Sequence, residues 1–209
     1  MGKLILARHH QSEWNKLGKW TGLYDSPLDP YGVEKASDMG TLIQDLSIDQ
    51  ALTSALTRTK ETLAHMLTAS DKHNVPTEHA AALNERDYGD YTGKNKFEMQ
   101  AILGDEEYKK LRRSWDYLVP NGETLKMVYD RVVPFYKEEI LPQVHADKNV
   151  LAVAHGNSLR ALIKYIEGIS DEGIADVEMP FGAILIYEVD HDGRILSKEV
   201  RQTESHVHA

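Results

Sequence analysis

Short apolar runs alternate along the chain with longer stretches in which apolar residues recur every three or four positions. The runs are short and rich in branched residues, as in buried strands, and predict strands at 4–7, 51–54, 149–154 and 183–189, with a weaker one at 77–82. The helical spacing predicts helices at roughly 31–45, 56–67, 125–144 and 159–166. This alternation predicts an α/β fold, which we expect to be a single-domain three-layer sandwich with a mostly parallel sheet and helices on both faces.

The remaining stretches predict short polar elements and breaks. A loop is expected at 83–93, followed by two polar helices near 96–103 and 105–117. Pro134 and Pro142 lie inside the pattern at 125–144 and should kink and end that helix, because proline lacks an N–H and its ring clashes with the preceding turn. We expect residues 1–200 to form one domain and residues 201–209 a mobile tail.

The composition excludes several classes of protein. A chain of 209 residues, 41% hydrophobic and 27% charged, is long enough to bury one core. The formal net charge of −9 argues against a nucleic-acid-binding surface, which needs a basic face. No apolar run has the length of a membrane span or of a signal-peptide core, and the absence of cysteine excludes disulfides. We therefore expect a cytoplasmic protein that binds neither nucleic acid nor membrane.

Two of the predicted strands end at histidines. The first is followed by Arg8, His9 and His10, and the strand at 149–154 by His155. Ligands of open α/β sheets bind at the edge where the strands end, so the two imidazoles are expected side by side, close to the arginine. The helix after His155 would present its N-terminal amides to an anion. Since the chain as a whole is acidic, an anion site here needs cations gathered locally.

These residue types suit the transfer of a phosphoryl group. An imidazole can attack phosphorus and hold the group as a phosphoramidate, while Arg8, Arg58 and His155 are candidates to surround its charged oxygens. A carboxylic acid must also give a proton to the leaving oxygen and take one back. Glu85, in the predicted loop at 83–93, is suited to that role.

Taken singly, each of these residues is more often structural, as a core histidine, a solvated arginine or a loop ion pair. A histidine-rich metal site is a further interpretation of the ten histidines. It is disfavoured because His9-His10 and the pair His206 and His208 are poorly spaced for one tetrahedral centre, and no two histidines stand four residues apart.

Longer segments around these residues carry more information. They are RHHQSEWN (8–15), LNERDYG (83–89) and HGNSLRAL (155–162), with TG (21–22), TSALTR (53–58), GKNK (93–96), RR (112–113) and PNGETL (120–125). Together they resemble the 2,3-bisphosphoglycerate-dependent phosphoglycerate mutases of the histidine phosphatase superfamily. The resemblance spans about residues 3–197, and the segments at 83–89, 112–113 and 155–162 are its most specific parts.

The resemblance implies a fold, a reaction and a set of roles. The fold would be that of the phosphoglycerate mutases. The enzyme would be an isomerase of glycolysis and gluconeogenesis that interconverts 3-phosphoglycerate and 2-phosphoglycerate, is primed by 2,3-bisphosphoglycerate and needs no metal. His9 would be the phosphorylated nucleophile, Glu85 the general acid and base, and His155 would stabilise the transition state. Substrate-binding residues would be Arg8, Asn15, Thr21, Gly22, Arg58, Arg86, Tyr88, Lys96, Arg112, Arg113, Gly156 and Asn157.

Three features depart from the family pattern. His10 stands where the family has glycine, Phe181 stands where threonine is usual, and the chain passes directly from Tyr117 to Pro120 without the insertion of longer mutases. A β-carbon at position 10 costs on the order of 1–2 kcal/mol if the backbone φ there is positive. The imidazole of His10 either turns away from the phosphoryl site or crowds it, and we expect it to turn away.

Two other functions stay open alongside the mutase. A phosphatase of the same superfamily would use the same His9, Glu85 and His155 but transfer the phosphoryl group to water. Lys96 and the pair Arg112-Arg113 favour the mutase, because a simple phosphatase does not need to retain a second anionic end. A phosphate-binding relative impaired by His10 is the non-enzymatic alternative. The partners expected are small phosphorylated three-carbon acids, and the choice between monomer and homo-oligomer is left open.

Overall fold

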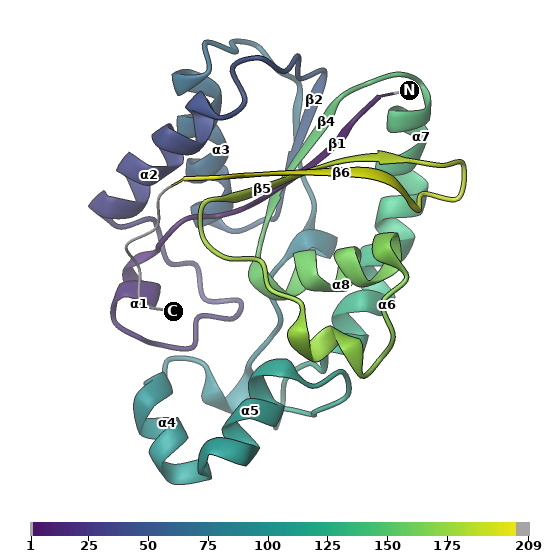
Figure 1. The fold of residues 1–209 in the computed structure, drawn as a ribbon. Coiled ribbons are helices and arrows are strands. Elements are labelled where there is room, and N and C mark those ends of the chain that lie inside the picture. The colour runs from purple at the N-terminus through teal and green to yellow at the C-terminus, as the bar shows by residue number, and fades with distance from the viewer. Residues whose placement is uncertain (1, 204–209) are drawn as a thin grey trace.

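The computed structural model describes residues 2–203, in which six strands form one mixed sheet (Figure 1). The sheet order is β3-β2-β4-β1-β5-β6. The bounds of the strands are β1 Leu4–Arg8, β2 Gln50–Thr53, β3 Thr77–His79, β4 Val150–Ala154, β5 Ala183–Val189 and β6 Ile195–Gln202. Strands β3, β2, β4 and β1 are parallel, whereas β5 is antiparallel to β1 and to β6. The predicted α/β fold with a mostly parallel sheet is confirmed.

Strands β1 and β4 lie at the centre of the sheet and are buried on both faces. They pair in parallel, with Arg8 opposite Ala154. Along β1, Leu4 and Leu6 contribute to one hydrophobic core and Ile5 contributes to the other, because successive side chains of a strand point to opposite faces. Burial on both faces accounts for the continuous apolar run in the sequence.

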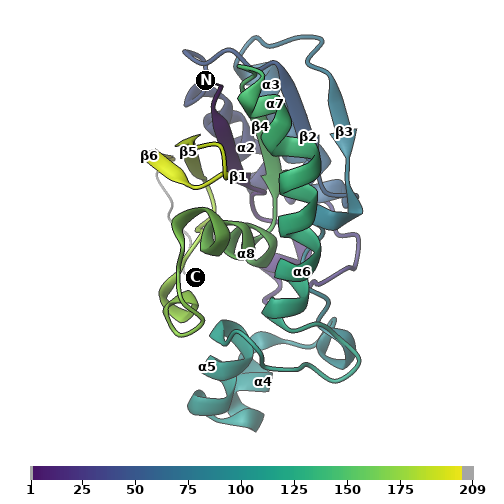
Figure 2. The same ribbon diagram turned by 90° about the vertical axis from the view of Figure 1, so that its right-hand side faces the viewer.

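Helices cover both faces of the sheet (Figures 1 and 2). One face packs against α2 (Pro30–Thr41) and α3 (Thr57–Ala69). The other packs against α6 (Leu125–Phe135), α7 (Leu141–His145) and α8 (Gly156–Glu167). The result is the expected three-layer arrangement. No helix within residues 2–203 is long and apolar enough to cross a membrane.

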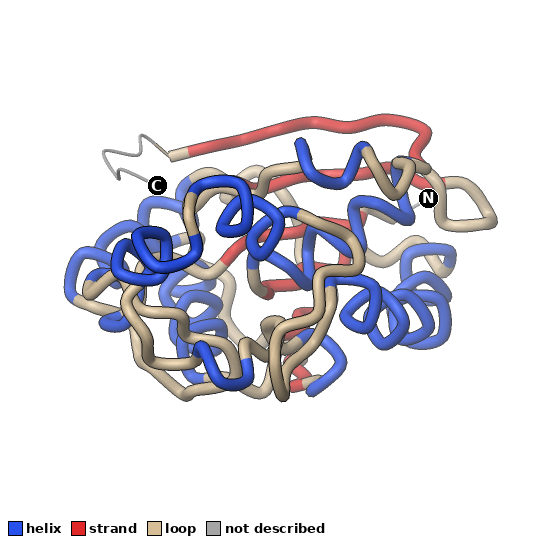
Figure 3. The backbone as a smooth tube through the Cα atoms, turned by 90° about the horizontal axis from the view of Figure 1, so that it is seen from below, coloured by secondary structure: helices blue, strands red, loops and turns tan. Residues whose placement is uncertain are grey.

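Short elements gather at the carboxyl end of the parallel strands. They are α1 (Glu13–Lys16), α4 (Lys96–Leu103) and α5 (Asp105–Arg113), and Figures 1 and 2 show α4 and α5 set apart below the sheet. Figure 3 views the molecule from this end, with loops and helices in front of the strands. Residues of α4 and α5 pack with residues of neighbouring loops in a small separate hydrophobic core. Its buried members are Trp20, Tyr88, Met99, Tyr108, Leu111 and Val119.

The helix predicted at 125–144 consists of three successive helical segments. Helix α6 ends one residue after Pro134, a turn of π-helix follows at Tyr136–Ile140, and α7 continues to His145. Pro142 does not end the helix, because it lies in the first turn of α7, where a missing N–H leaves no bond unmade. The π-helical turn follows directly after the segment that contains Pro134.

Other boundaries also differ from the sequence prediction. Strand β6 was not predicted, because most of its residues are exposed and its sequence lacks an apolar alternation. It includes Arg201 and Gln202, which the sequence predicts to lie in a mobile tail; residues 204–209 of that tail, with His206 and His208, lie outside the described residues. The ends of α2, β3 and α5 fall three to four residues earlier than predicted, and turns of 3-10 helix occupy Ala81–Leu83, Gly89–Tyr91 and Gly173–Asp176.

Candidate active site

His9 and His155 lie side by side because they follow neighbouring parallel strands. His9 follows β1 and donates its backbone N–H to the carbonyl of Ala154 at 2.9 Å, while His155 follows β4 and caps the N-terminus of α8. The centroids of their rings are 4.9 Å apart in an edge-on arrangement. Both side chains are almost completely buried. The side-by-side placement that the two strand ends predicted is confirmed.

The environment of His9 leaves one ring nitrogen available as a nucleophile. Nδ1 lies 2.6 Å from the carbonyl oxygen of His10, and since a carbonyl can only accept, Nδ1 carries the hydrogen and Nε2 the lone pair. Burial, together with the charges of Arg58 and Arg8, holds the pKa of His9 well below its ordinary value. The imidazole is therefore neutral at neutral pH, as an attacking group must be.

Three buried donors near His9 have no hydrogen-bond partner among the described residues. They are Nε of Arg8, Nε of Arg58 and Nδ1 of His155. The rest of each side chain is held: Arg8 Nη1 donates to the carbonyl of Met179 at 2.8 Å, and Arg58 donates to the carbonyls of Tyr24 and Gly22 at 2.9 Å each. Leaving a buried donor unpaired costs roughly 1–3 kcal/mol, so three such donors at one place indicate a site for an anion with several oxygens.

The second nitrogen of His155 is fixed by a hydroxyl. Its Nε2 lies 2.8 Å from Oγ of Ser54, which also accepts the N–H of Leu56. When the hydroxyl donates to Nε2, Nδ1 carries the hydrogen and can donate to an anion. Burial and the nearby Arg58 hold the pKa of His155 well below its ordinary value, so the ring is neutral.

Glu85 lines the same pocket as His9, and its carboxylate is held by two backbone amides. Its Oε1 accepts the backbone N–H of Arg86 at 2.8 Å and that of Asn157 at 3.2 Å. The amide of Asn157, in the first turn of α8, therefore holds the carboxylate and is not free for an anion. The side-chain amide of Asn157 donates to the hydroxyl of Tyr88 at 2.8 Å, which ties the Glu85 loop to α8.

A second group of cations comes from α4 and α5. Lys96 begins α4, and Arg112 and Arg113 end α5. Burial and the charges of Arg8 and Arg112 lower the pKa of Lys96 to about 8. Arg113 forms an ion pair with Glu178. These cations lie far along the chain from His9, and only the fold brings them to the same cavity.

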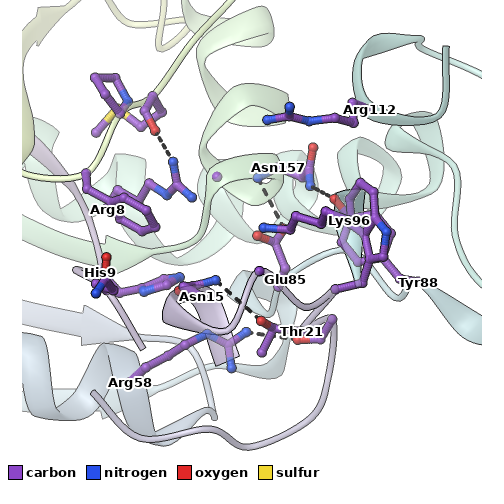
Figure 4. A pocket seen from close by; sticks show the side chains of 18 of the residues that line it. Arg8, His9, Asn15, Thr21, Arg58, Glu85, Tyr88, Lys96, Arg112 and Asn157 are labelled. Carbon is purple, nitrogen blue, oxygen red and sulfur yellow. Dashed lines mark hydrogen bonds between the residues drawn. The ribbon is translucent and has the colours of Figure 1, made fainter. Parts of the chain in front are cut away.

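One pocket of about 500 Å³ is lined by His9, Glu85 and the cations described above, but not by His155. In Figure 4, His9 lies between Arg8 and Arg58, Lys96 and Arg112 lie on the opposite side, and Glu85 lies between the two groups. The lining has two acidic side chains, Glu85 and Glu178, against seven basic ones: Arg8, Lys16, Arg58, Lys96, Arg112, Arg113 and Arg160. The cations expected of an anion site in an acidic chain are thus gathered at this pocket.

The structure places the predicted site residues together with two exceptions. His155 is not among the residues that line the pocket, although its ring centroid lies 4.9 Å from that of His9. Arg86 is fully buried and also does not line the pocket; its guanidinium donates to the backbone carbonyls of Leu111, Tyr117 and Glu123. The prediction that Arg86 contacts the substrate is corrected, because its donors are used to hold the segments around α5. The other predicted residues all line the pocket.

Several residues of the pocket were not predicted from the sequence. Arg160 donates to the carbonyls of Arg112 and Arg113 at 3.3 and 3.2 Å, and to Oδ1 of Asn157 at 3.0 Å. Trp20 packs against Tyr88 with ring centroids 4.5 Å apart. Arg160 stood inside the segment at 155–162 and could have been singled out, whereas Trp20 gave no signal beyond its place in a loop. Other unpredicted lining residues include Gln11, Leu17, Phe97, Met179 and Phe181.

The side chain of His10 turns away from the pocket, as expected. It is completely buried, does not line the cavity, and packs between Tyr31 and Phe181. Positive φ values among the described non-glycine residues occur at Asp71, Asn74, Asn121 and Asp147, so the backbone at position 10 is unstrained.

Residues 4–200 match the family model of the histidine phosphatase superfamily (branch 1). The chain is 41% identical to 2,3-bisphosphoglycerate-dependent phosphoglycerate mutase 2 of Latilactobacillus sakei, over 95% of this chain and 99% of that protein. It is 42% identical to the 2,3-bisphosphoglycerate-dependent phosphoglycerate mutase of Enterococcus faecalis, with the same coverage. The chain belongs to this family of mutases within the histidine phosphatase superfamily.

The curated relatives differ from this chain in length. The alignments run over 226 and 225 positions, more than the 209 residues of this chain, so these relatives carry segments that it lacks. Among solved structures, the α-ribazole phosphatase of Shigella flexneri matches with a TM-score of 0.78 and 26% identity, over 97% of this chain and 96% of that one. Among the described residues, no group of three or more histidine, cysteine, aspartate or glutamate side chains could hold a metal ion.

Proposed function

We propose that this protein is a phosphoglycerate mutase that interconverts 3-phosphoglycerate and 2-phosphoglycerate through a phosphohistidine on His9. The observation that carries the proposal is the pairing of two anion-binding groups in one pocket. One group consists of the unpartnered donors around Nε2 of His9, and the other of the cations from α4 and α5. A phosphorylated acid has an anion at each end and needs both.

In this proposal, His9 attacks the phosphorus with the lone pair of Nε2. Nε of Arg8, Nε of Arg58 and Nδ1–H of His155 donate to the equatorial oxygens, whose charge they stabilise during transfer. These donors are already oriented, because their other nitrogens are bonded to backbone carbonyls or to Ser54. Asn15 and Gly156, which line the same end of the pocket, complete the phosphoryl site.

Glu85 is the proposed general acid and base. It gives a proton to the substrate oxygen that leaves phosphorus, and takes a proton from the hydroxyl that receives the phosphoryl group. Two backbone N–H groups donate to one carboxylate oxygen, Oε1, and fix its position. The other oxygen, Oε2, is therefore the one able to exchange a proton. This arrangement positions the carboxyl group without blocking it.

The outer cations are proposed to hold the rest of the substrate. Lys96, Arg112 and Arg113 would bind the carboxylate, with Thr21, Gly22, Tyr88 and Asn157 forming the wall between the two ends. Because the second phosphate of 2,3-bisphosphoglycerate needs the same kind of site, these residues also fit the primer, which supplies the phosphoryl group that first loads His9. A volume of about 500 Å³ has room for a three-carbon acid to turn between its two orientations.

The proposed setting is the glycolytic and gluconeogenic metabolism of the cytoplasm. The proposed ligands are small phosphorylated three-carbon acids, and the proposed chemistry uses no metal, since residues of the chain itself carry every role assigned above. A charge of −9 is consistent with the absence of a nucleic-acid partner.

A product assay separates this function from hydrolysis. The purified protein is incubated with 3-phosphoglycerate and a trace of 2,3-bisphosphoglycerate, and both 2-phosphoglycerate and inorganic phosphate are measured. We expect 2-phosphoglycerate to form much faster than phosphate, and to depend on the trace of bisphosphate. Release of phosphate without 2-phosphoglycerate would identify a phosphatase, and no product at all would identify a phosphate-binding relative.

A further inference from the structure

His10 and Phe181, the two residues that depart from the family pattern, lie against each other. Strand β5 is antiparallel to β1, with Ala7 opposite Ile184. Extending that register by three residues beyond Ala7 brings His10 opposite Phe181. Their ring centroids are 5.5 Å apart, with the planes tilted by 33°. The contact therefore follows from the strand pairing that builds the site.

Phe181 also contacts the phosphoryl site. Cζ of Arg8 lies 3.9 Å from the centroid of the Phe181 ring, in a cation–π arrangement. The ring meets that of His9 edge-on, with centroids 5.9 Å apart. Phe181 lines the pocket and is only half-buried. One face of the Arg8 guanidinium is thus covered by an apolar ring, next to the nucleophile.

His10 supports that ring from outside the pocket. Its Nδ1 accepts the backbone N–H of Gln11 at 2.8 Å, which fixes the plane of the imidazole. Tyr31 packs against its other side, with ring centroids 5.6 Å apart. Burial and the charge of Arg8 lower the pKa of His10 to about 4, so the ring is neutral and adds no charge to the site. A neutral, fixed and buried ring is suited to hold a neighbouring ring in place.

We propose that His10 and Phe181 act as one unit that orients Arg8 and keeps water from the phosphoryl group on His9. Phe181 is the specificity-determining residue, because it selects the substrate hydroxyl over water as the acceptor. His10 is a positioning residue that acts through Phe181. The inference rests on the proposed function, since it concerns the lifetime of phospho-His9.

The step that the unit suppresses is hydrolysis of the phosphoenzyme. In that step a water oxygen forms a bond to phosphorus, and the bond between phosphorus and Nε2 breaks with its electron pair returning to Nε2. The proton of the water passes to Glu85, and inorganic phosphate leaves. Replacing the Phe181 ring with a small polar side chain gives water a path to the phosphorus and frees Arg8 to move.

The test measures the lifetime of the phosphoenzyme in the absence of acceptor. The protein is loaded with 2,3-bisphosphoglycerate labelled in its phosphates, separated from it, and assayed over time for acid-labile phosphate on the protein. The variants are Phe181→Thr, Phe181→Leu, His10→Gly, His10→Leu and the double variant His10→Gly with Phe181→Thr. Tyr31→Phe is the matched control, because it alters the surroundings of His10 without touching Phe181 or the pocket.

We expect Phe181→Thr to shorten the lifetime of the phosphoenzyme by about tenfold. This factor corresponds to the loss of one partly desolvated cation–π contact. His10→Gly should shorten it by about threefold, and His10→Leu, which keeps the volume, should restore most of the wild-type lifetime. Phe181→Leu separates the two parts of the role: it keeps the volume that excludes water but loses the π face, so its lifetime should lie between those of the wild type and Phe181→Thr.

The double variant decides whether the two residues act as a unit. If His10 acts only through Phe181, His10→Gly should have no further effect once Phe181 is threonine. Additive effects, or an unchanged lifetime in Phe181→Thr, would overturn the inference. These outcomes are distinct from failure of the proposed function, in which the wild-type protein itself would take up no acid-labile phosphate.

Discussion

At the scale of single residues, the site depends on which nitrogens and oxygens are already bonded. His9 has one ring nitrogen bonded to a carbonyl and one left for attack, and Arg8 and Arg58 each have Nε left over after their other donors are used. The motifs RHH and HGN predicted these residue types at these strand ends. They could not predict the hydrogen bonds, because the partner carbonyls belong to distant segments such as Met179.

Glu85→Gln tests the proton transfer. The amide has the same shape and can keep the backbone bonds to Arg86 and Asn157, but it cannot exchange a proton. We expect turnover with 3-phosphoglycerate to fall by about 10²–10⁴ while the affinity for substrate changes little. Steady-state kinetics measure both quantities, and a loss of only a few-fold would show that Glu85 has a structural role alone.

Lys96 should make catalysis sensitive to alkaline pH. Its folded-state pKa is lowered to about 8, so the side chain is charged below that pH and loses its charge as the pH rises through it. Because kcat/KM reports the free enzyme, we expect kcat/KM to fall above about pH 8, while kcat changes less. Lys96→Arg stays charged, and the fall should move to higher pH; identical profiles for both proteins would contradict this role.

At the scale of elements, the pocket depends on two arginines that hold backbone segments, the buried Arg160 and the partly buried Arg131. Arg160 donates to the last carbonyls of α5, which carries Arg112 and Arg113. Arg131, on α6, donates to the carbonyls of Asn84 and Glu85 at 3.0 Å each. Neither role follows from the local sequence, because a helical arginine is ordinarily solvated and its acceptors lie up to 49 residues away.

The two arginines should affect different kinetic constants. Arg160→Gln loosens the end of α5, so we expect KM for 3-phosphoglycerate to rise by about tenfold, or ~1.4 kcal/mol, with a smaller change in kcat. Arg131→Gln loosens the Glu85 loop, so kcat should fall more than KM rises. Each variant serves as the control for the other. Thermal unfolding of both variants shows whether only their stability is altered. If kcat and KM change equally in both variants, the separate roles of Arg160 and Arg131 are contradicted.

At the scale of the whole molecule, an acidic protein gathers seven basic side chains at one pocket. The sequence predicted the sheet and its covering helices because buried strands such as β1 and β4 are continuous apolar runs and the helices have apolar faces. It did not predict β6, whose side chains are mostly exposed, or the π-helical turn at Tyr136–Ile140 between α6 and α7. The sequence predicted that Arg86 lines the pocket. A family resemblance does not distinguish a residue that contacts the substrate from one that holds the surrounding backbone segments.

The most direct test of the account is the location of the phosphoryl group on the protein. The protein is loaded with 2,3-bisphosphoglycerate, and the phosphorylated residue and ring nitrogen are identified by peptide mapping and by NMR of the phosphohistidine. We predict one acid-labile phosphate on Nε2 of His9, lost rapidly on addition of 3-phosphoglycerate and absent from His9→Ala. Phosphate on Nδ1, on another histidine, or retained in His9→Ala would contradict this prediction.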